Sequence, residues 1–305
     1  MVNTQRAGVL SFSRSLLRAT RPRQWVKNLL VFAAPAAAGA LGHLHSVVRA
    51  GLAGLVFILA SCGTYLINDV NDISNDRAHP TKRLRPVAAG EITVPVAASL
   101  GAIFIAGSVA GAWLLAGRSL GLCLATYVVL TCAYSMGLKR IPYLELVIVS
   151  SGFVLRAIAG GIAVHVSISL WFLVVTSACA LLIASGKRTA ELMLLQDKSE
   201  AHRAVIAHYS SLKLEFVRIG FSIVAAASYA LWTFSPAAQI DAHHTDGHDI
   251  FFRLSTVPFV FGLIALERLL RRGEGGEPEE LALRSHTLQF AGLCCVALVA
   301  IGIYR

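Results

Sequence analysis

The stretch GLAGLVFILASCGTYLINDVNDISND, residues 51–76, passes from an apolar run directly into an acidic segment. The run Gly51–Ile67 is apolar enough for a membrane helix, and Asp69, Asp72 and Asp76 follow it at positions i, i+3 and i+7. On a helix that turns about 100° per residue, these positions fall within an arc of ~60°, so the three carboxylates share one face. The segment therefore predicts a membrane helix that ends in an aspartate-lined face.

Oxygen ligands of this kind favour a magnesium site at the end of that helix. Carboxylates are costly to bury in a membrane span, so a cluster of three indicates a function. Mg²⁺ binds a few carboxylates and shares its remaining positions with water and substrate phosphates. We expect Mg²⁺ as the cofactor, Asp69, Asp72 and Asp76 as catalytic metal ligands, and Asn68 as a ligand of metal and substrate. The alternative is a solvated loop with incidental charge pairs, which the shared helix face disfavours.

A basic segment, RAHPTKRLRP, follows the aspartates over residues 77–86. Acidic residues followed by basic ones at one membrane surface suit a magnesium–diphosphate complex, because the cations can bind the phosphate oxygens that the metal leaves free. The candidates for this phosphate binding are Lys82, Arg83 and Arg85.

Composition places the chain in a membrane. The 305 residues are 56% hydrophobic and 14% charged, with a mean hydropathy of +0.66, whereas an ordinary soluble domain carries about 25% charged residues. Apolar runs near the ~20 residues that cross a bilayer recur along the chain. They predict an all-α, polytopic membrane protein with nine helices at Trp25–Leu44, Gly51–Ile67, Val94–Ala116, Leu120–Met136, Tyr143–Val164, Leu170–Ser185, Phe216–Phe234, Phe251–Leu269 and Leu288–Tyr304.

Basic residues alternate with this pattern of spans. Most of the 27 lysines and arginines fall in the N-terminal segment and in the even-numbered connections, and cytoplasmic loops carry such an excess. We therefore predict a multi-pass protein of the plasma membrane with a cytoplasmic N-terminus and active site and an external C-terminus. The net charge of +10 is attributed to topology, anionic lipid headgroups and phosphate binding, and it does not indicate nucleic acid. The six cysteines fall in apolar runs and are interpreted as small buried residues.

Two parts are expected along the chain. Residues 1–24 are polar and arginine-rich, lack the hydrophobic core of a signal peptide, and are predicted to form a cytoplasmic tail with a short interfacial helix over 9–19. Residues 25–305 are predicted to form one transmembrane domain with cytoplasmic cap loops and helices. Within it, Ala190–Leu214 is predicted as a helix on the membrane surface. The outer connection 237–250 is rich in His and Asp, and a solvated loop is favoured there over a metal site.

A second polar site follows the sixth predicted span and reads GKRTAE over residues 186–191. Two adjacent cations at a membrane surface can hold a diphosphate, and Arg188 offers a bidentate fork. Lys187 and Glu191 are four residues apart, on one helix face, and Glu191 is expected to complete the metal site. The alternative is a topological anchor with an internal salt bridge, which we favour less because the aspartate cluster is present.

Arg156 lies inside the fifth predicted span, in the sequence FVLRAIAGG. An arginine at that depth is expected to face a polar cavity and to have a partner. We expect that partner to be a substrate phosphate, above all that of a lipid, or an internal carboxylate. Lys27 and Asn28 open the first predicted span and are expected to reach the same cavity.

With these features the chain resembles the UbiA superfamily of intramembrane prenyltransferases. Asn68–Asp76 is similar to the family's first aspartate-rich motif, NDxxDxxxD, and the segment YSMGLKR is similar to its Tyr…Lys-Arg loop. The resemblance covers nearly the whole chain and implies a nine-helix, magnesium-dependent enzyme. It also implies substrate-binding roles for Tyr134, Lys139 and Arg140 in that loop. The residues of the loop alone favour a topological anchor.

One departure from the family points to a particular branch. Most members carry a second DxxxD motif where this chain has residues 186–191, so one acidic residue remains and two cations replace the rest. The strings RPRQWVKN, NDVNDISNDRAHPTKRLRP, VLRAIAGG, GKRTAEL and GEPEELALR resemble the branch that acts in actinobacterial arabinan synthesis. The resemblance implies transfer of a 5-phosphoribosyl group from phosphoribosyl pyrophosphate to polyprenyl (decaprenyl) phosphate, with release of pyrophosphate, for arabinogalactan and lipoarabinomannan precursors.

The chemistry of such a transfer is consistent with these residues. A phosphate nucleophile is already ionised at neutral pH, so no strong general base is needed, and the barrier lies in the departing pyrophosphate. No glycine-rich phosphate loop, HExxH, CxxC or nucleophile elbow occurs in the sequence, which disfavours serine or zinc chemistry. The alternatives are an aromatic prenyltransferase of quinone or haem synthesis, disfavoured by the missing motif, and a transporter or lipid scaffold. A homo-oligomer is compatible with this interpretation.

Overall fold

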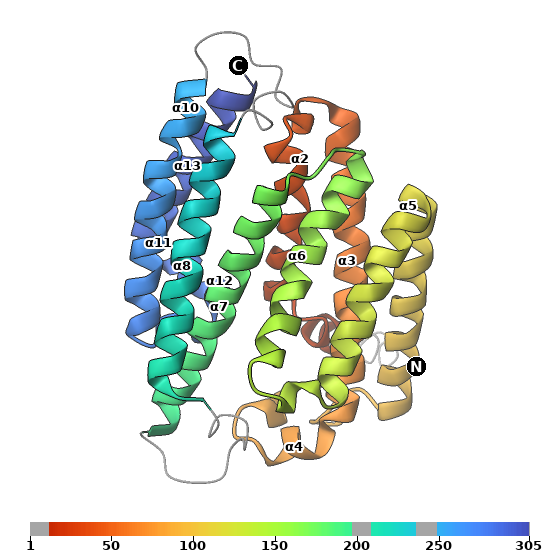
Figure 1. The fold of residues 1–305 in the computed structure, drawn as a ribbon. Coiled ribbons are helices and arrows are strands. Elements are labelled where there is room, and N and C mark those ends of the chain that lie inside the picture. The colour runs from red at the N-terminus through yellow and green to blue at the C-terminus, as the bar shows by residue number, and fades with distance from the viewer. Residues whose placement is uncertain (1–11, 197–208, 236–248, 305) are drawn as a thin grey trace.

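The computed structural model describes residues 12–196, 209–235 and 249–304, and these residues form helices and turns without a strand. Figure 1 shows the long helices side by side, with α4 and the end of α7 at the lower end and α2 at the upper end. The all-α class predicted from composition is confirmed. After a helical stretch over 12–19, the elements are η1 (Pro22–Phe32), α2 (Ala33–Ala37), η2 (Ala40–Gly42), α3 (Leu44–Asn71), α4 (Ile73–Ala78), η3 (Lys82–Leu84), α5 (Val94–Met136), η4 (Leu138–Arg140), α6 (Leu144–Val164), α7 (Leu170–Gln196), α8 (Ser211–Phe234), α10 (Asp249–Leu254), α11 (Thr256–Arg271), η6 (Glu274–Gly276), α12 (Pro278–Arg284) and α13 (His286–Tyr304).

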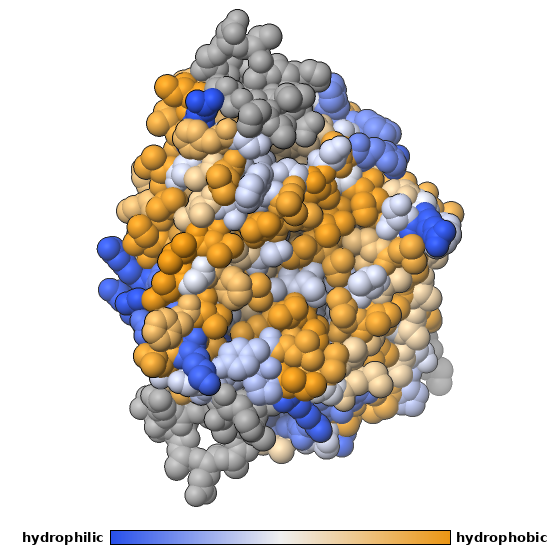
Figure 2. All heavy atoms as spheres, in the orientation of Figure 1, coloured by the Kyte–Doolittle hydropathy of each residue, from blue (hydrophilic) through white to orange (hydrophobic). Residues whose placement is uncertain are grey.

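The long helices make this an integral membrane protein. Among the described residues, seven helical segments are long and apolar enough to cross a membrane: α3, α5, α6, α7, α8, α10 with α11, and α13. Figure 2 shows hydrophobic side chains over most of the visible face. Large apolar side chains such as Leu114 and Leu293 are 87% and 70% exposed. Such a surface is stable against lipid tails rather than water.

The predicted count of nine spans differs from these seven in two places. The first is α5, which contains two predicted spans, Val94–Ala116 and Leu120–Met136. Its backbone leaves the helical region at Ala116 (φ −145, ψ 28) and at Gly117 (φ 66, ψ −157), a conformation that glycine adopts without a steric penalty. The two arms of α5 then pack closely on each other at Gly121. A Cβ at this position would lie only 2.7 Å from the Trp113 ring.

The second difference is the predicted first span, Trp25–Leu44. This segment is not a continuous α-helix, since η1 is a 3₁₀ helix and only Ala33–Ala37 is α-helical before α3 begins. A helix continued through the middle of this span would lose a hydrogen bond at Pro35, which has no N–H to donate. This segment is consequently not one of the seven helical segments that are long enough to cross a membrane. The helix lengths therefore do not confirm nine spans.

Glycines bring η1 and α5 against the site-bearing helices. A Cβ on Gly63 of α3 would lie 2.8 Å from the carbonyl oxygen of Gly101 in α5, and a Cβ on Gly160 of α6 would overlap the carbonyl of Val31. Small residues allow such close backbone approach between membrane helices. The contact at Gly160 holds η1 against α6, which places Asn28 beside Arg156.

Three further predictions concern connections. The predicted surface helix Ala190–Leu214 is wrong in its described part, because residues 190–196 continue α7 and a new helix begins at Ser211. Leu192 packs in an apolar cluster that includes Ala184 of α7. This contact holds residues 190–196 in line with α7. The helix predicted over 9–19 is helical from residue 12 onward. Most of the histidine-rich connection lies outside the described residues.

Candidate active site

The three aspartates lie where α3 ends and α4 begins. Asp69 is in the last turn of α3, Asp72 joins the two helices with φ −96 and ψ 9, and Asp76 is in α4. Asp69 and Asp76 are 1% and 3% exposed, whereas the Asp72 side chain is 21% exposed. The predicted single helical face is therefore broken at Asp72, and two buried carboxylates remain beside one accessible carboxylate.

One arginine bridges the two buried carboxylates. Arg85 follows η3, and its Nη1 donates to Asp76 Oδ2 at 2.7 Å and to Asp69 Oδ1 at 3.3 Å. Its side chain is 26% exposed, so the bridge is reached from solvent. A single cationic nitrogen thus occupies a position between two buried carboxylate oxygens. That position and those oxygen donors fit a hard divalent cation such as Mg²⁺.

Two further cations complete the charge balance of the cluster. Arg21, just before η1, donates to Asp69 and lies over the Tyr65 ring at 4.7 Å from its centre. Lys139 in η4 donates to both oxygens of Asp72 at 2.8 Å. Three carboxylates therefore meet three cations from three separate segments. Because each carboxylate is turned toward a cation, no group of three His, Cys, Asp or Glu side chains within the described ranges is arranged to hold a metal ion.

The second site is a buried arginine enclosed by carboxylates. Arg188 donates to Glu145 and to Glu191, and the side chains of Arg188 and Glu145 are 8% and 1% exposed. The Tyr209 hydroxyl donates to Glu145 Oε1 at 3.0 Å and accepts the backbone N–H of Tyr143 at 2.7 Å. Burial raises the pKa of the Tyr209 phenol, so the hydroxyl stays protonated and keeps donating.

The structure adds a pairing that the sequence did not predict in the second site. Glu191 pairs with Arg188, three residues away, and Lys187 is exposed, while the metal role of Glu191 and the phosphate role of Lys187 stay predictions. On a helix, side chains three and four residues apart are both neighbours, so either Arg188 or Lys187 could pair with Glu191. Arg188 forms the pair that the structure shows, because it faces the bundle interior. Sequence reasoning also missed Glu145. Its signal was a single carboxylate entering an apolar run, which requires a buried partner.

Arg156 is buried among neutral groups, at 5% exposure. Its Nε donates to Asn28 Oδ1 at 2.8 Å, Nη1 to the Gly152 carbonyl at 2.7 Å, and Nη2 to Ser61 Oγ at 3.0 Å and Tyr127 Oη at 3.1 Å. The expectation that this arginine and Asn28 share a polar site is confirmed. The expected internal carboxylate is not among these partners. A buried cation with neutral partners retains an attraction for an anion.

The other predicted substrate ligands lie in η1, α3, η3, α5 and η4. Those that are partly buried are Lys27, Asn68, Lys82 and Tyr134, and those that are exposed are Arg83 and Arg140. Lys27 donates to Gln24, and Tyr134 is close enough to Arg188 for the two groups to interact electrostatically. Tyr134 therefore lies near the Arg188 cluster. Arg21 was not predicted as a site residue. The Arg-Pro dipeptide before the first predicted span was a signal for a cation at the aspartate end of the bundle.

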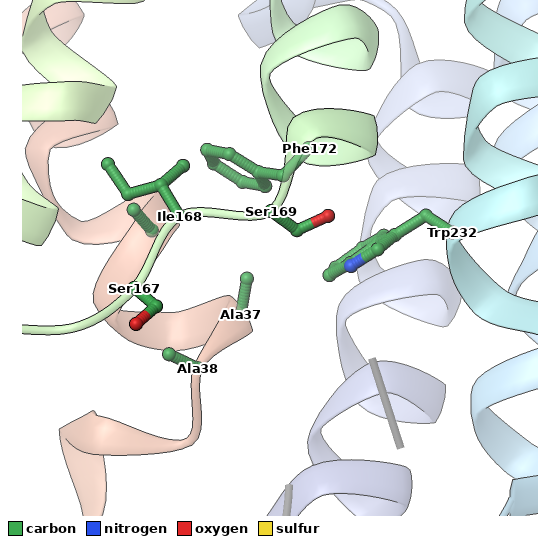
Figure 3. A pocket seen from close by; sticks show the side chains of 8 residues that line it. Ala37, Ala38, Ser167, Ile168, Ser169, Phe172 and Trp232 are labelled. Atoms are coloured by element: carbon green, nitrogen blue, oxygen red, sulfur yellow. The ribbon is translucent and has the colours of Figure 1, made fainter. Parts of the chain in front are cut away.

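A small cavity lies at the opposite end of the bundle. It measures about 30 Å³ and is lined from α2, from the segment before α7, and by Phe172 and Trp232. Figure 3 shows the Ser169 hydroxyl and the Trp232 ring on the same side of the cavity. Phe172 precedes Arg188 by about 24 Å along α7 at 1.5 Å per residue. The cavity is too small for a diphosphate and lies far from the charged clusters, so it is not the candidate site.

Comparisons with known proteins agree with this geometry. The model of the UbiA prenyltransferase family matches residues 29–284. A decaprenyl-phosphate phosphoribosyltransferase of Mycolicibacterium smegmatis is 38% identical over 95% of this chain and 92% of its own length. One of Corynebacterium glutamicum is 36% identical over 99% and 90%. The fold is that of a UbiA homologue from Archaeoglobus fulgidus bound to GPP and Mg²⁺, with a TM-score of 0.65 at 17% identity over 94% of this chain and 98% of that one.

Proposed function

The chain belongs to the UbiA prenyltransferase family, and from that premise we propose that it transfers a 5-phosphoribosyl group from phosphoribosyl pyrophosphate to decaprenyl phosphate or a similar polyprenyl phosphate. Pyrophosphate is the leaving group. The observation that carries the proposal is the 36–38% identity, over most of both chains, to relatives named decaprenyl-phosphate phosphoribosyltransferase. The product is a precursor for arabinogalactan and lipoarabinomannan.

The donor diphosphate is assigned to the aspartate cluster. Asp69 and Asp76, whose oxygens Arg85 Nη1 contacts in the structure, would hold the metal together with Asp72, and Asn68 would be a further oxygen donor. When bound, a divalent metal supplies Lewis-acid stabilisation of the charge on the departing pyrophosphate. With the carboxylates engaged by a metal, Arg85 and Lys139 would be available to bind diphosphate oxygens. Lys82 and Arg83 lie on the same basic segment and extend this positive surface.

The acceptor phosphate is assigned to the other side of the reacting carbon. Its oxygen attacks ribose C1 while the C1–O bond to pyrophosphate breaks, and no proton has to be removed because the phosphate is ionised at neutral pH. Arg156 is the cation for this phosphate, since its partners in the structure are neutral and it lies in the membrane part of the bundle. Asn28, Ser61 and Tyr127 orient its guanidinium. Holding both anions in one site removes the entropic cost of their encounter.

Arg188 is assigned to the donor side of the site as a guanidinium that two carboxylates hold in a fixed orientation. Glu145 and Glu191 hold its guanidinium, and Tyr134 interacts with it electrostatically. A fixed cation of this kind can orient the 5-phosphate of the donor without moving during the reaction. Arg188→Lys would keep the charge but lose the bidentate fork. We therefore expect a higher apparent KM for the donor. Lys187→Ala is the matched control, because Lys187 is exposed.

The membrane arrangement that belongs to this proposal has nine spans and cytoplasmic caps. The two arms of α5 count as two spans, and η1 with α2 forms a short first one. Basic residues at the end that carries α4 support a cytoplasmic N-terminus and active site and an external C-terminus. Phosphoribosyl pyrophosphate, which is soluble, would then reach the aspartates from the cytoplasm.

Pyrophosphate release tests the proposal. Purified protein is incubated with Mg²⁺, decaprenyl phosphate and phosphoribosyl pyrophosphate, and a parallel sample receives geranylgeranyl diphosphate and an aromatic acceptor. We expect pyrophosphate only in the first sample. Release only in the second would make the protein an aromatic prenyltransferase, and release in neither would favour a transporter or a lipid scaffold.

A further inference from the structure

Arg21 holds an uncommon backbone conformation beside the most buried aspartate. Its φ of 53 and ψ of 66 lie in the left-handed region, which is unfavourable for residues that carry a side chain. Pro22 follows it, and a residue before proline is disfavoured in the right-handed helical region. From this conformation the guanidinium reaches Asp69 and lies over the Tyr65 ring.

The backbone around Arg21 is anchored, whereas its side chain is accessible. Arg18 Nη1 donates to Glu91 Oε1 at 2.9 Å, and Trp25 Nε1 donates to the Thr20 carbonyl at 3.1 Å. The Arg21 side chain is 28% exposed. Rotation of the side chain alone can therefore move its charge, without displacing the preceding helix.

A metal ion held by Asp69 would compete with Arg21 for that carboxylate. Arg21 donates to Asp69 Oδ1, the oxygen that Arg85 also contacts at 3.3 Å. Asp69 is 1% exposed, so it needs a counter-charge at all times. A divalent cation on that oxygen would repel the guanidinium at short range, while a diphosphate on the same cation would attract it.

We propose that Arg21 is a donor-binding residue that exchanges Asp69 for a phosphate oxygen when the metal–diphosphate complex binds. In the structure described here Arg21 acts as the counter-ion of Asp69. In the donor complex the same guanidinium binds the diphosphate as a charge-assisted hydrogen-bond donor. The inference deepens the proposed function and rests on it, because it takes the donor to carry a diphosphate.

The test uses a variant that removes the charge and tolerates the backbone. Arg21→Asn loses the cation, and asparagine is enriched in the left-handed region. Arg21→Gly is a second variant that also tolerates this backbone. Arg23→Asn is the matched control, because it removes the same charge from a side chain that is 88% exposed and 3.3 Å from Glu280. Calorimetry on the purified full chain measures binding of Mg²⁺ alone, then binding of phosphoribosyl pyrophosphate with saturating Mg²⁺.

The exchange predicts opposite changes in the two affinities. In both Arg21 variants, Mg²⁺ alone should bind about tenfold more tightly because its competitor is gone, and the donor should bind about tenfold more weakly. The Arg23 control should match the wild-type protein. Unchanged metal affinity would overturn the exchange, and unchanged donor affinity would overturn the contact with phosphate.

Inorganic pyrophosphate separates this inference from the proposed function. If the wild-type protein failed to bind phosphoribosyl pyrophosphate, the proposed function would be wrong. A tenfold loss of pyrophosphate affinity in Arg21→Asn, together with tighter Mg²⁺ binding, would still support the exchange. Pyrophosphate binding that is equal in Arg21→Asn and in the Arg23 control would overturn it.

Discussion

The two charged clusters at the α4 end have opposite designs. At the end of α3, buried carboxylates are neutralised by cations whose side chains are 26–28% exposed. On α7, a buried cation is neutralised by Glu145, which is 1% exposed. Accessible counter-ions can leave a site when a stronger ligand arrives, whereas a buried pair is fixed by the cost of separating its charges. The first cluster is therefore suited to exchange its partners, and the second is suited to keep them.

The largest expected effect is the loss of the fixed pair. Glu145→Ala leaves Arg188 with only Glu191 in a buried setting, and breaking a buried pair costs about 3–5 kcal/mol. Thermal unfolding of the purified protein should show this as a lowered Tm. Arg284→Gln is the matched control, since Arg284 is 79% exposed and pairs with Glu280 at 2.8 Å, and such pairs contribute at most about 1 kcal/mol. Equal losses in the two variants would remove the distinction between fixed and exchangeable clusters.

The next effect concerns catalysis at the exchangeable cluster. Asp76→Asn keeps the shape of the side chain but removes the charge that holds a metal. We expect turnover to fall by about 10²–10³, the usual cost of one contact to developing charge, while the Tm changes little because Arg85 still has Asp69. Glu280→Gln is the surface control. Turnover in EDTA close to that with Mg²⁺ would contradict this account of the cluster.

A third prediction separates the acceptor from the donor. Arg156→Gln removes the cation of the membrane cluster while keeping a hydrogen-bonding side chain. The apparent KM for decaprenyl phosphate should rise about tenfold, in line with the loss of one charged hydrogen bond. Donor affinity should remain unchanged, because both charged clusters at the α4 end are intact. Lost donor affinity with normal lipid saturation would place Arg156 in the donor half.

The smallest effect concerns the segment that carries Arg21. The Ser15 hydroxyl and Arg18 hold the pKa of the Glu91 carboxyl below its usual value. A carboxyl whose pKa is lowered by folding stabilises the fold above its unfolded pKa of about 4.3 and loses that contribution as pH falls through the folded value. The protection of the amides over 12–19, measured relative to the intrinsic exchange rate at each pH, should therefore fall below about pH 4. In Glu91→Gln the exchange should be fast already at neutral pH, and a variant indistinguishable from wild type would show that this anchor is unimportant.

Sequence patterns predicted the parts of this molecule that depend on periodicity and composition. The apolar runs indicated the long helices, and the aspartate spacing with its basic neighbours indicated the cluster that Arg85 and Lys139 complete. Local composition could not show that the first predicted span begins as the 3₁₀ helix η1. Nor could it choose Arg188 over Lys187 as the buried cation, because that choice depends on which face of α7 packs inward. The partners Arg21 and Glu145 are 48 and 43 residues from the charges they meet, so only the tertiary structure shows these pairs.

Donor binding with and without metal tests the central claim most directly. Equilibrium binding of phosphoribosyl pyrophosphate is measured on the purified wild-type protein and on Asp76→Asn, in Mg²⁺ and in EDTA. We predict that wild-type protein binds the donor only with Mg²⁺ and that Asp76→Asn binds it at least tenfold more weakly, since the aspartates would hold the metal that carries the diphosphate. Equal affinity in Mg²⁺ and in EDTA, for both proteins, would contradict the account, because the donor would then be held by the cations alone.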